Sequence, residues 1–144
     1  MKIAIASDHA GFALKEAIKE AYIEHQFVDF GAYSEQSVDY PDTGYQAAKA
    51  VADGTCNVGI VICGSGIGMS ITANKVPGIR AALCTITDVA RLSRMHNDAN
   101  VLALAGRFTA TAYALQIVDT WLVTPFEGGR HQTRINKIHQ GERS

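Results

Sequence analysis

The sequence predicts one three-layer α/β/α domain, spanning residues 1–144, with a five-stranded and mostly parallel sheet. Short apolar, β-prone runs alternate along the chain with longer amphipathic runs, which is the pattern of a parallel sheet covered by helices on both faces. The chain has 144 residues, 47% of them hydrophobic and 19% charged. That length is typical of a single domain, and the composition is that of a folded globular protein.

The elements follow in order from the N-terminus. Residues 2–6 form a β-prone run, and residues 11–26 place alanines, Leu14, Ile18 and Tyr22 at helical spacing with Lys and Glu between them. The same reasoning places strands at 2–6, 27–30, 58–62, 79–84 and 101–105, and helices at 11–26, 43–52, 69–75, 88–95, 110–123 and after 129. Apolar and polar residues do not alternate cleanly along the expected strands, which is the pattern expected for strands that are buried on both faces. A buried helical segment looks the same over so few residues.

The bulk charge and the cysteines exclude several classes of protein. A net charge of −1 provides no general attraction for nucleic acid or an anionic membrane, so any anion site must be local. Three cysteines without C-x-x-C spacing predict reduced thiols rather than disulfides or a zinc site. No membrane-spanning run or signal peptide is recognised, which leads us to expect a cytoplasmic protein whose polar tail, 140–144, frays or reaches a neighbouring subunit.

The segments richest in potentially reactive side chains directly follow the expected strands. Asp8 and His9 follow the first strand, residues 63–68 (CGSGIG) follow the third, and Arg107 follows the fifth. Ligands of open parallel sheets bind beyond the carboxyl ends of the strands, where these loops converge. We therefore expect the functional site at this edge.

The glycine-rich run and Cys63 allow two interpretations. Gly64, Gly66 and Gly68 can bring backbone N–H groups and a helix N-terminus close to an anion or oxyanion, and Cys63 beside that N-terminus can act as base or nucleophile. Alternatively, the glycines only form a tight turn and the thiol only fills space. The run is neither G-x-G-x-x-G nor a P-loop, which disfavours a nucleotide site.

Two further pairs lie away from these loops. Arg130 and Arg134 share one face of a helix and can bind one phosphate, although such pairs are usually solvated. His96 and Asn97 precede the fifth strand, so in their own subunit they belong near the opposite edge. They either enter a neighbouring subunit's site or simply end a helix and form a turn. His25, His131 and His139 are interpreted as exposed helix positions without a role.

At this point the sequence resembles the type B ribose-5-phosphate isomerases and their relatives that act on allose 6-phosphate and galactose 6-phosphate. The motifs that carry the resemblance span nearly the whole chain: SDHAGFALK, DYPD, CGSGIGMSITANKVPGIRAALC, LSRMHNDANVLALAGR and FEGGRHQTRI. The resemblance implies a Rossmann-like fold and no metal or organic cofactor. It also implies a homodimer, in some members paired into a tetramer, with active sites shared between subunits.

Matching motifs imply specific roles. Cys63 is the base that transfers the proton, Ser65 retains the hydroxyl that many members supply with Thr, and His96 assists opening of the furanose ring. The residues expected on the sugar or its phosphate are Asp8, His9, Gly64, Gly66, Ile67, Gly68, Asn97, Arg107, Arg130 and Arg134. Some members use a Glu further along as the base, but the corresponding position here is not acidic.

The implied activity is interconversion of D-ribose 5-phosphate and D-ribulose 5-phosphate through an enediolate, a reaction of the pentose phosphate pathway. A 1,2-proton shift needs one base and hydrogen-bond donors for the enediolate oxygen, and Cys63 with the glycine loop supplies both. The phosphate cannot share that loop and is assigned to the arginines. Alternatives are an allose or galactose 6-phosphate isomerase, a non-catalytic phosphosugar-binding module, and a nicotinamide-dependent oxidoreductase, which lacks its fingerprint.

Overall fold

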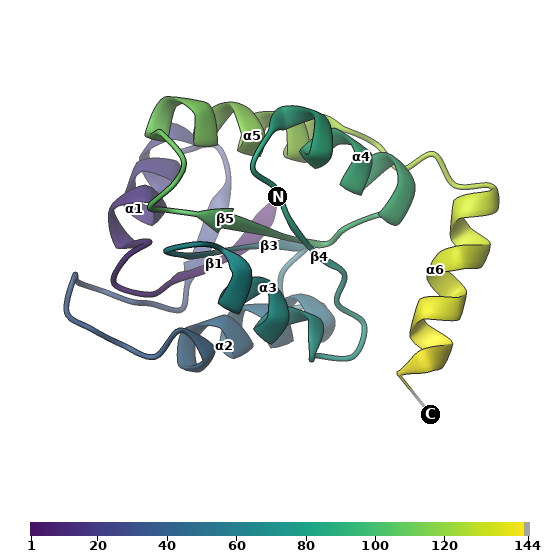
Figure 1. The fold of residues 1–144 in the computed structure, drawn as a ribbon, viewed down its shortest axis with the longest axis horizontal. Helices are drawn as coiled ribbons and strands as arrows, with labels where there is room; N and C mark the ends of the chain where they lie inside the picture. Colours follow the sequence, from purple (N-terminus) through teal and green to yellow (C-terminus); the bar gives the residue numbers. More distant parts are fainter. Residues whose placement is uncertain (143–144) are drawn as a thin grey trace.

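A computed structural model describes residues 1–142 as a five-stranded sheet with six helices (Figure 1). The strands are β1 (Lys2–Ser7), β2 (Gln26–Asp29), β3 (Val58–Cys63), β4 (Ala81–Leu83) and β5 (Val101–Ala105). The helices are α1 (Phe12–Ala21), α2 (Tyr40–Ala52), α3 (Ile67–Asn74), α4 (Thr87–Asn97), α5 (Thr111–Val123) and α6 (Arg130–Gly141). All four strand pairings are parallel, in the order β2-β1-β3-β5-β4.

Two apolar clusters, one on each face of the sheet, form the core. Alternate residues of β3 point to opposite faces: Ile60 and Ile62 belong to the cluster under α1, α4 and α5, whereas Val61 and Cys63 belong to the cluster under α2 and α3. Every residue of β3 is buried, which explains why the strand sequence shows no polar alternation. The predicted three-layer α/β/α fold is confirmed.

Element boundaries differ from the sequence prediction where the chain must turn or reaches the edge of the sheet. Helix α1 ends at Ala21, five residues earlier than predicted, because the chain turns there to enter β2 and His25 contacts the N-terminal ammonium. Strand β4 is an edge strand of three residues, shorter than the predicted 79–84. Just before it, the Arg80 N–H donates to the side-chain oxygen of Asn100, a contact between distant residues that replaces a backbone hydrogen bond of the ladder. Helix α2 begins at Tyr40 with Pro41 in its first turn, where proline is tolerated.

Helix α6 stands apart from the three layers and packs against α4 (Figure 1). It continues through Gly141, and the Glu142 carboxylate accepts a hydrogen bond from the Gly78 N–H at 3.1 Å. Residues 140–142 are therefore ordered against the domain rather than frayed, while residues 143–144 of the predicted tail lie outside the described residues. No helix within residues 1–142 has the length and apolarity needed to cross a membrane.

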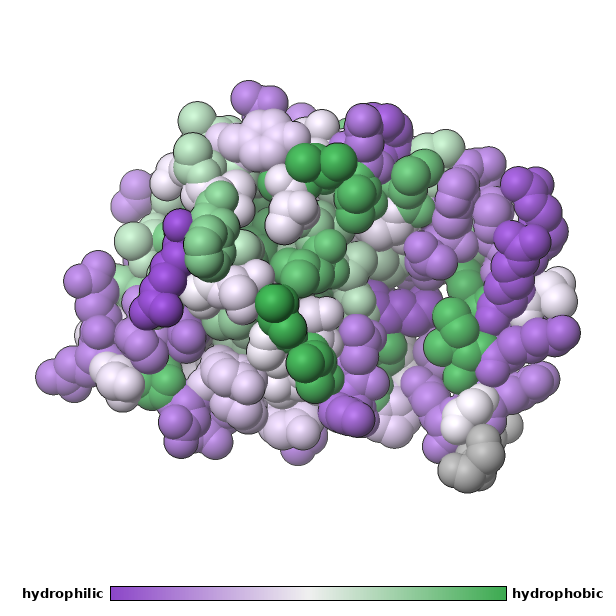
Figure 2. All heavy atoms as spheres, viewed as in Figure 1, coloured by the Kyte–Doolittle hydropathy of each residue, from purple (hydrophilic) through white to green (hydrophobic). Residues whose placement is uncertain are grey.

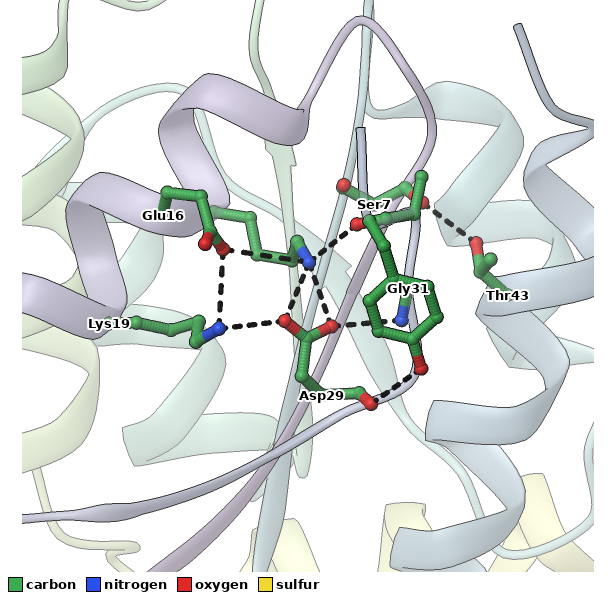
Figure 3. Close-up of polar contacts among 9 residues, drawn as sticks. Ser7, Glu16, Lys19, Asp29, Gly31 and Thr43 are labelled. Atoms are coloured by element: carbon green, nitrogen blue, oxygen red, sulfur yellow. Dashed lines mark hydrogen bonds and ion pairs between the residues drawn. The ribbon is translucent and has the colours of Figure 1, made fainter. Parts of the chain in front are cut away.

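A buried lysine fastens α1 to the loop after β2. Lys15 is fully buried, and its Nζ donates to both carboxylate oxygens of Asp29, at 2.8 and 2.7 Å, and to the Ala32 carbonyl at 2.6 Å. Figure 3 shows Asp29 between Lys19 and the Gly31 N–H, which also donate to it. Burial opposes ionisation of Asp29, but these donors outweigh it and lower its pKa. The carboxylate therefore stabilises the fold above the ordinary Asp pKa, and this contribution is lost as the pH falls through the lowered value.

Replacing Lys15 with methionine is expected to lower the free energy of unfolding by about 3 kcal/mol, because it leaves a largely buried carboxylate without its main partner. Urea unfolding of Lys15→Met and Lys19→Met measures the difference. The Lys19 side chain is 31% exposed, so its removal should cost only about 1 kcal/mol or less. Equal losses in the two variants would contradict the assignment of Lys15 as the principal partner.

Candidate functional site

The three central strands place the predicted residues Asp8, Cys63 and Arg107 at one edge of the sheet. Strands β1, β3 and β5 are neighbours, and Cys63 at the end of β3 is in register with Ala105 at the end of β5. A cavity of about 450 Å³ opens beyond these ends. Its lining residues are Asp8, Tyr40, Cys63, Gly64, Ser65, Ile67, Gly68, Ile71, Arg107 and Phe108.

The glycine run forms one wall of this cavity and leads into α3. Gly66 precedes α3 with a φ of +77°, a conformation that favours glycine, and the Ser65 hydroxyl accepts a hydrogen bond from the Ile67 N–H at 3.2 Å. A Cβ at Gly68 would lie 2.6 Å from Cζ of Tyr40. The glycines therefore serve a tight turn, and within residues 1–142 the N–H groups of Ser65 and Gly66 donate no hydrogen bond. Those N–H groups are available to an oxygen of a ligand.

Cys63 differs from the other two cysteines in its surroundings. It is 4% exposed, but it lines the cavity beside the first turn of α3. Burial raises the pKa of Cys84 to about 11 and also raises the pKa of Cys56, so both stay protonated and inert at neutral pH. Among the three thiols, only Cys63 lines this cavity.

Asp8, His9 and Arg107 lie at the same edge of the sheet but make different contacts. The Asp8 carboxylate is buried and accepts a hydrogen bond from the Gly11 N–H at 2.9 Å, which fixes it at the start of the turn into α1. His9 does not line the cavity; its Nδ1 accepts a hydrogen bond from the Val38 N–H at 3.3 Å and so holds the loop before α2. Arg107 is exposed, and its side chain packs against Gly64.

The remaining predicted residues lie at the opposite edge of the same chain. His96 and Asn97 form the end of α4, just before β5 begins. The carbonyl of Asn97 accepts a hydrogen bond at 2.9 Å from Arg80, the residue that precedes β4. Arg130 and Arg134 are exposed on α6, which packs on α4, and neither has an ion pair within residues 1–142. The predicted site residues thus fall into two groups at opposite edges of the sheet.

The prediction that His25, His131 and His139 are exposed helix positions is wrong. His25 lies in the turn between α1 and β2, and its side chain is only 20% exposed. His131 is 6% exposed, because its ring stacks on His96 with centroids 4.4 Å apart and an interplanar angle of 17°. His139 is half-buried and contacts the Arg80 guanidinium at 2.7 Å. His131, Ile135 and His139 follow one another at four-residue spacing along one side of α6, and this periodicity is the signal in the sequence that points to their burial.

His96, Glu127 and His131 also form a group whose possible ligand atoms lie within 4.8 Å of one another. A metal ion would require nitrogen lone pairs that converge on one point. Because the two imidazole rings are nearly parallel, their in-plane lone pairs do not converge, and chelation would need one ring to rotate. The arrangement fits a stacked pair with an adjacent carboxylate better than a metal centre.

Sequence reasoning missed some residues of the cavity. Phe108 is 81% exposed at its rim, and nothing in the sequence marked it beyond its place after Arg107. Ile71 lies one helical turn after Ile67, and both are exposed.

Comparisons with known proteins agree on one family. A family model described as ribose/galactose isomerase matches residues 3–138. Ribose-5-phosphate isomerase B of Escherichia coli is 48% identical over 95% of this chain and 93% of its own. Among solved structures, ribose-5-phosphate isomerase B of Clostridium thermocellum superimposes with a TM-score of 0.98 at 54% identity, covering 99% of this chain and 98% of that one. Ribose-5-phosphate isomerase B of Mycoplasma genitalium, solved with bound ribulose-5-phosphate, superimposes with a TM-score of 0.94 at 43% identity, covering 99% of this chain and 97% of that one.

Proposed function

Because the chain belongs to the ribose/galactose isomerase family, we propose that it is an aldose-ketose isomerase that interconverts D-ribose 5-phosphate and D-ribulose 5-phosphate. The observation that carries this proposal is the position of Cys63, which lies at a cavity beside a helix N-terminus and unpaired loop N–H groups. A proton shift between two adjacent carbons needs this combination of one base and fixed donors.

In the proposed reaction, the Cys63 thiolate takes the proton from C2 of the open-chain aldose. The electron pair forms the C1–C2 double bond of an enediolate, whose oxygen accepts hydrogen bonds from the loop 64–68 and the Ser65 hydroxyl. The C1 oxygen then takes up a proton while the C2 hydroxyl loses one, and the proton held by the thiol returns to C1, which leaves the ketose with its carbonyl at C2. Asp8, which is buried and fixed by the Gly11 N–H, is available to a sugar hydroxyl on the other side of the cavity.

The second group of residues completes the site from a partner subunit. From this group we assign ring opening to His96 and binding of the phosphate to Arg130 and Arg134, with Asn97 as a further contact. On the Cys63 side, Arg107 also binds the phosphate and His9 is a further contact. The two groups lie at opposite edges of one chain, so a shared site needs a second copy. Figure 2 shows apolar atoms over α3 and α4 on the face in view. Ile67 and Ile71 of α3 and Leu92 of α4 are exposed. These surfaces support a homodimer, which a further pairing could extend to a tetramer.

Three further properties belong to this proposal. Residues 1–144 act as one sugar-phosphate isomerase domain, since the family match spans 3–138. The reaction uses the chain's own groups, with no metal or organic cofactor. The protein works in the cytoplasm, a reducing compartment suited to the free thiols of Cys56, Cys63 and Cys84.

A side-by-side assay on ribose 5-phosphate, allose 6-phosphate and galactose 6-phosphate, with EDTA present, tests the proposal. We expect ribose 5-phosphate to give the highest kcat/KM and EDTA to leave it unchanged. Preference for a six-carbon substrate would retain the mechanism and change the substrate. Turnover of none of the three would favour a phosphosugar-binding module, and loss of activity with EDTA would refute the cofactor-free reaction.

A further inference from the structure

The ring of His96 is held on two sides by residues that have no role in the reaction described above. On its face, the His131 ring stacks at 4.4 Å. At its edge, Oε1 of Glu127 lies 3.5 Å from Nε2. The segment that carries Glu127 is itself fixed, because its N–H donates to the Met95 carbonyl at 3.0 Å. The His96 ring, at the end of α4, is therefore contacted by residues from the first turn of α6 and from the loop before it. Helices α4 and α6 lie next to each other in Figure 1.

His131 is suited to act as a neutral flat surface. It is 6% exposed, and its Nε2 has no hydrogen-bond partner within residues 1–142. Burial, together with repulsion from His96 and the neighbouring Arg130 and Arg134, lowers the pKa of His131. A neutral ring can stack against a His96 that gains a proton, whereas two charged rings would repel each other.

We propose that Glu127 and His131 are positioning residues for His96, with His131 fixing the plane of the ring and Glu127 fixing its rotation within that plane. A general acid must present its proton along a narrow direction, so an imidazole that rotates freely loses efficiency. This inference rests on the proposed function, because it assigns to the pair the orientation of the ring-opening group. Neither residue needs to contact the sugar.

The two sugars of the proposed reaction allow ring opening to be measured separately from proton transfer. Opening of ribose 5-phosphate breaks the C1–O4 bond, with one proton leaving the C1 hydroxyl and one added to O4. Ribulose 5-phosphate is already open, because its C5 oxygen carries the phosphate and cannot close a furanose. Exchange of its C1 hydrogen with solvent therefore requires Cys63 but not His96.

The experiment compares kcat/KM for ribose 5-phosphate with the rate of deuterium incorporation at C1 of ribulose 5-phosphate in D₂O. In Glu127→Gln and His131→Ala, turnover of ribose 5-phosphate should fall by about ten-fold to a hundred-fold, the scale expected from misplacing one catalytic group. Incorporation should stay within about two-fold of wild type, because Cys63 and its loop lie at the other edge of the chain. His131→Phe retains a flat ring and should keep most of the turnover.

Two controls bound the interpretation. Asp88→Asn removes an exposed carboxylate from the first turn of the same α4 helix and should change neither rate. Equal losses of both rates in Glu127→Gln and His131→Ala would overturn the proposal, because they would indicate general damage to the fold, and so would unchanged turnover. If His131→Phe lost as much turnover as His131→Ala, the stacking role would be refuted. Wild-type protein active in neither assay would instead refute the proposed function.

Discussion

The Cys63→Ala protein is expected to fold normally and to lose turnover of ribose 5-phosphate by about a thousand-fold, the scale of a lost general base. The loss should appear in kcat, because the thiol acts on the reacting carbons rather than on binding of the phosphate. Deuterium incorporation into ribulose 5-phosphate should fall by the same factor, since both reactions pass through removal of a carbon-bound proton. Removing one sulfur atom from a residue at the cavity wall leaves the sheet hydrogen bonds of β3 in place.

A matched cysteine provides the control for this experiment. Cys56 is buried in the same apolar cluster as Cys63 but does not line the cavity, so Cys56→Ala should retain full kcat. Unfolding midpoints of both variants show whether any loss reflects the fold. A Cys63→Ala protein that retained wild-type turnover would exclude Cys63 as the base.

The fold was predictable because its signals are local. Each buried strand is an apolar run, and each covering helix has apolar positions three and four residues apart, so short windows specify both. The errors occurred where distant contacts set the boundary. Strand β4 begins only after Arg80, whose N–H donates to the Asn100 side chain, and α1 stops at Ala21 because the chain turns toward β2. Neither the contact between Arg80 and Asn100 nor the turn toward β2 can be identified from the few residues around each boundary.

The site was predictable to the extent that topology places it. Parallel strands bring their carboxyl ends together, and this rule alone gathers Asp8, Cys63 and Arg107 around one cavity. It gives no information about side chains on a helix that leaves the sheet. The burial of His131 depends on how α6 packs on α4, and the role that we propose for Arg130 and Arg134 depends on the surface of a second subunit.

Because Cys63 and His96 lie at opposite edges of one chain, we expect a second large effect: two inactive variants should recover activity when they are mixed. Cys63→Ala and His96→Ala proteins each lack one half of every site, so both homodimers should be nearly inactive. In a mixed dimer, one site receives the intact Cys63 and the partner subunit's intact His96, whereas the other site receives neither. Random exchange of equal amounts makes half of the dimers mixed, each with one of two sites complete, so about a quarter of wild-type activity should return.

The measurement is turnover of ribose 5-phosphate before and after subunit exchange, with native mass spectrometry to show that mixed dimers form. If Cys63 and His96 instead acted within one chain, every site of the mixed dimer would still lack one of them, and no activity would return. Mixing Cys63→Ala protein with a Cys63→Ala, His96→Ala double variant provides the control, because it leaves no complete site in either arrangement. Recovery in the first mixture alone would place the two residues in different subunits of one site, as their position at opposite edges of a single sheet requires if they act on the same sugar.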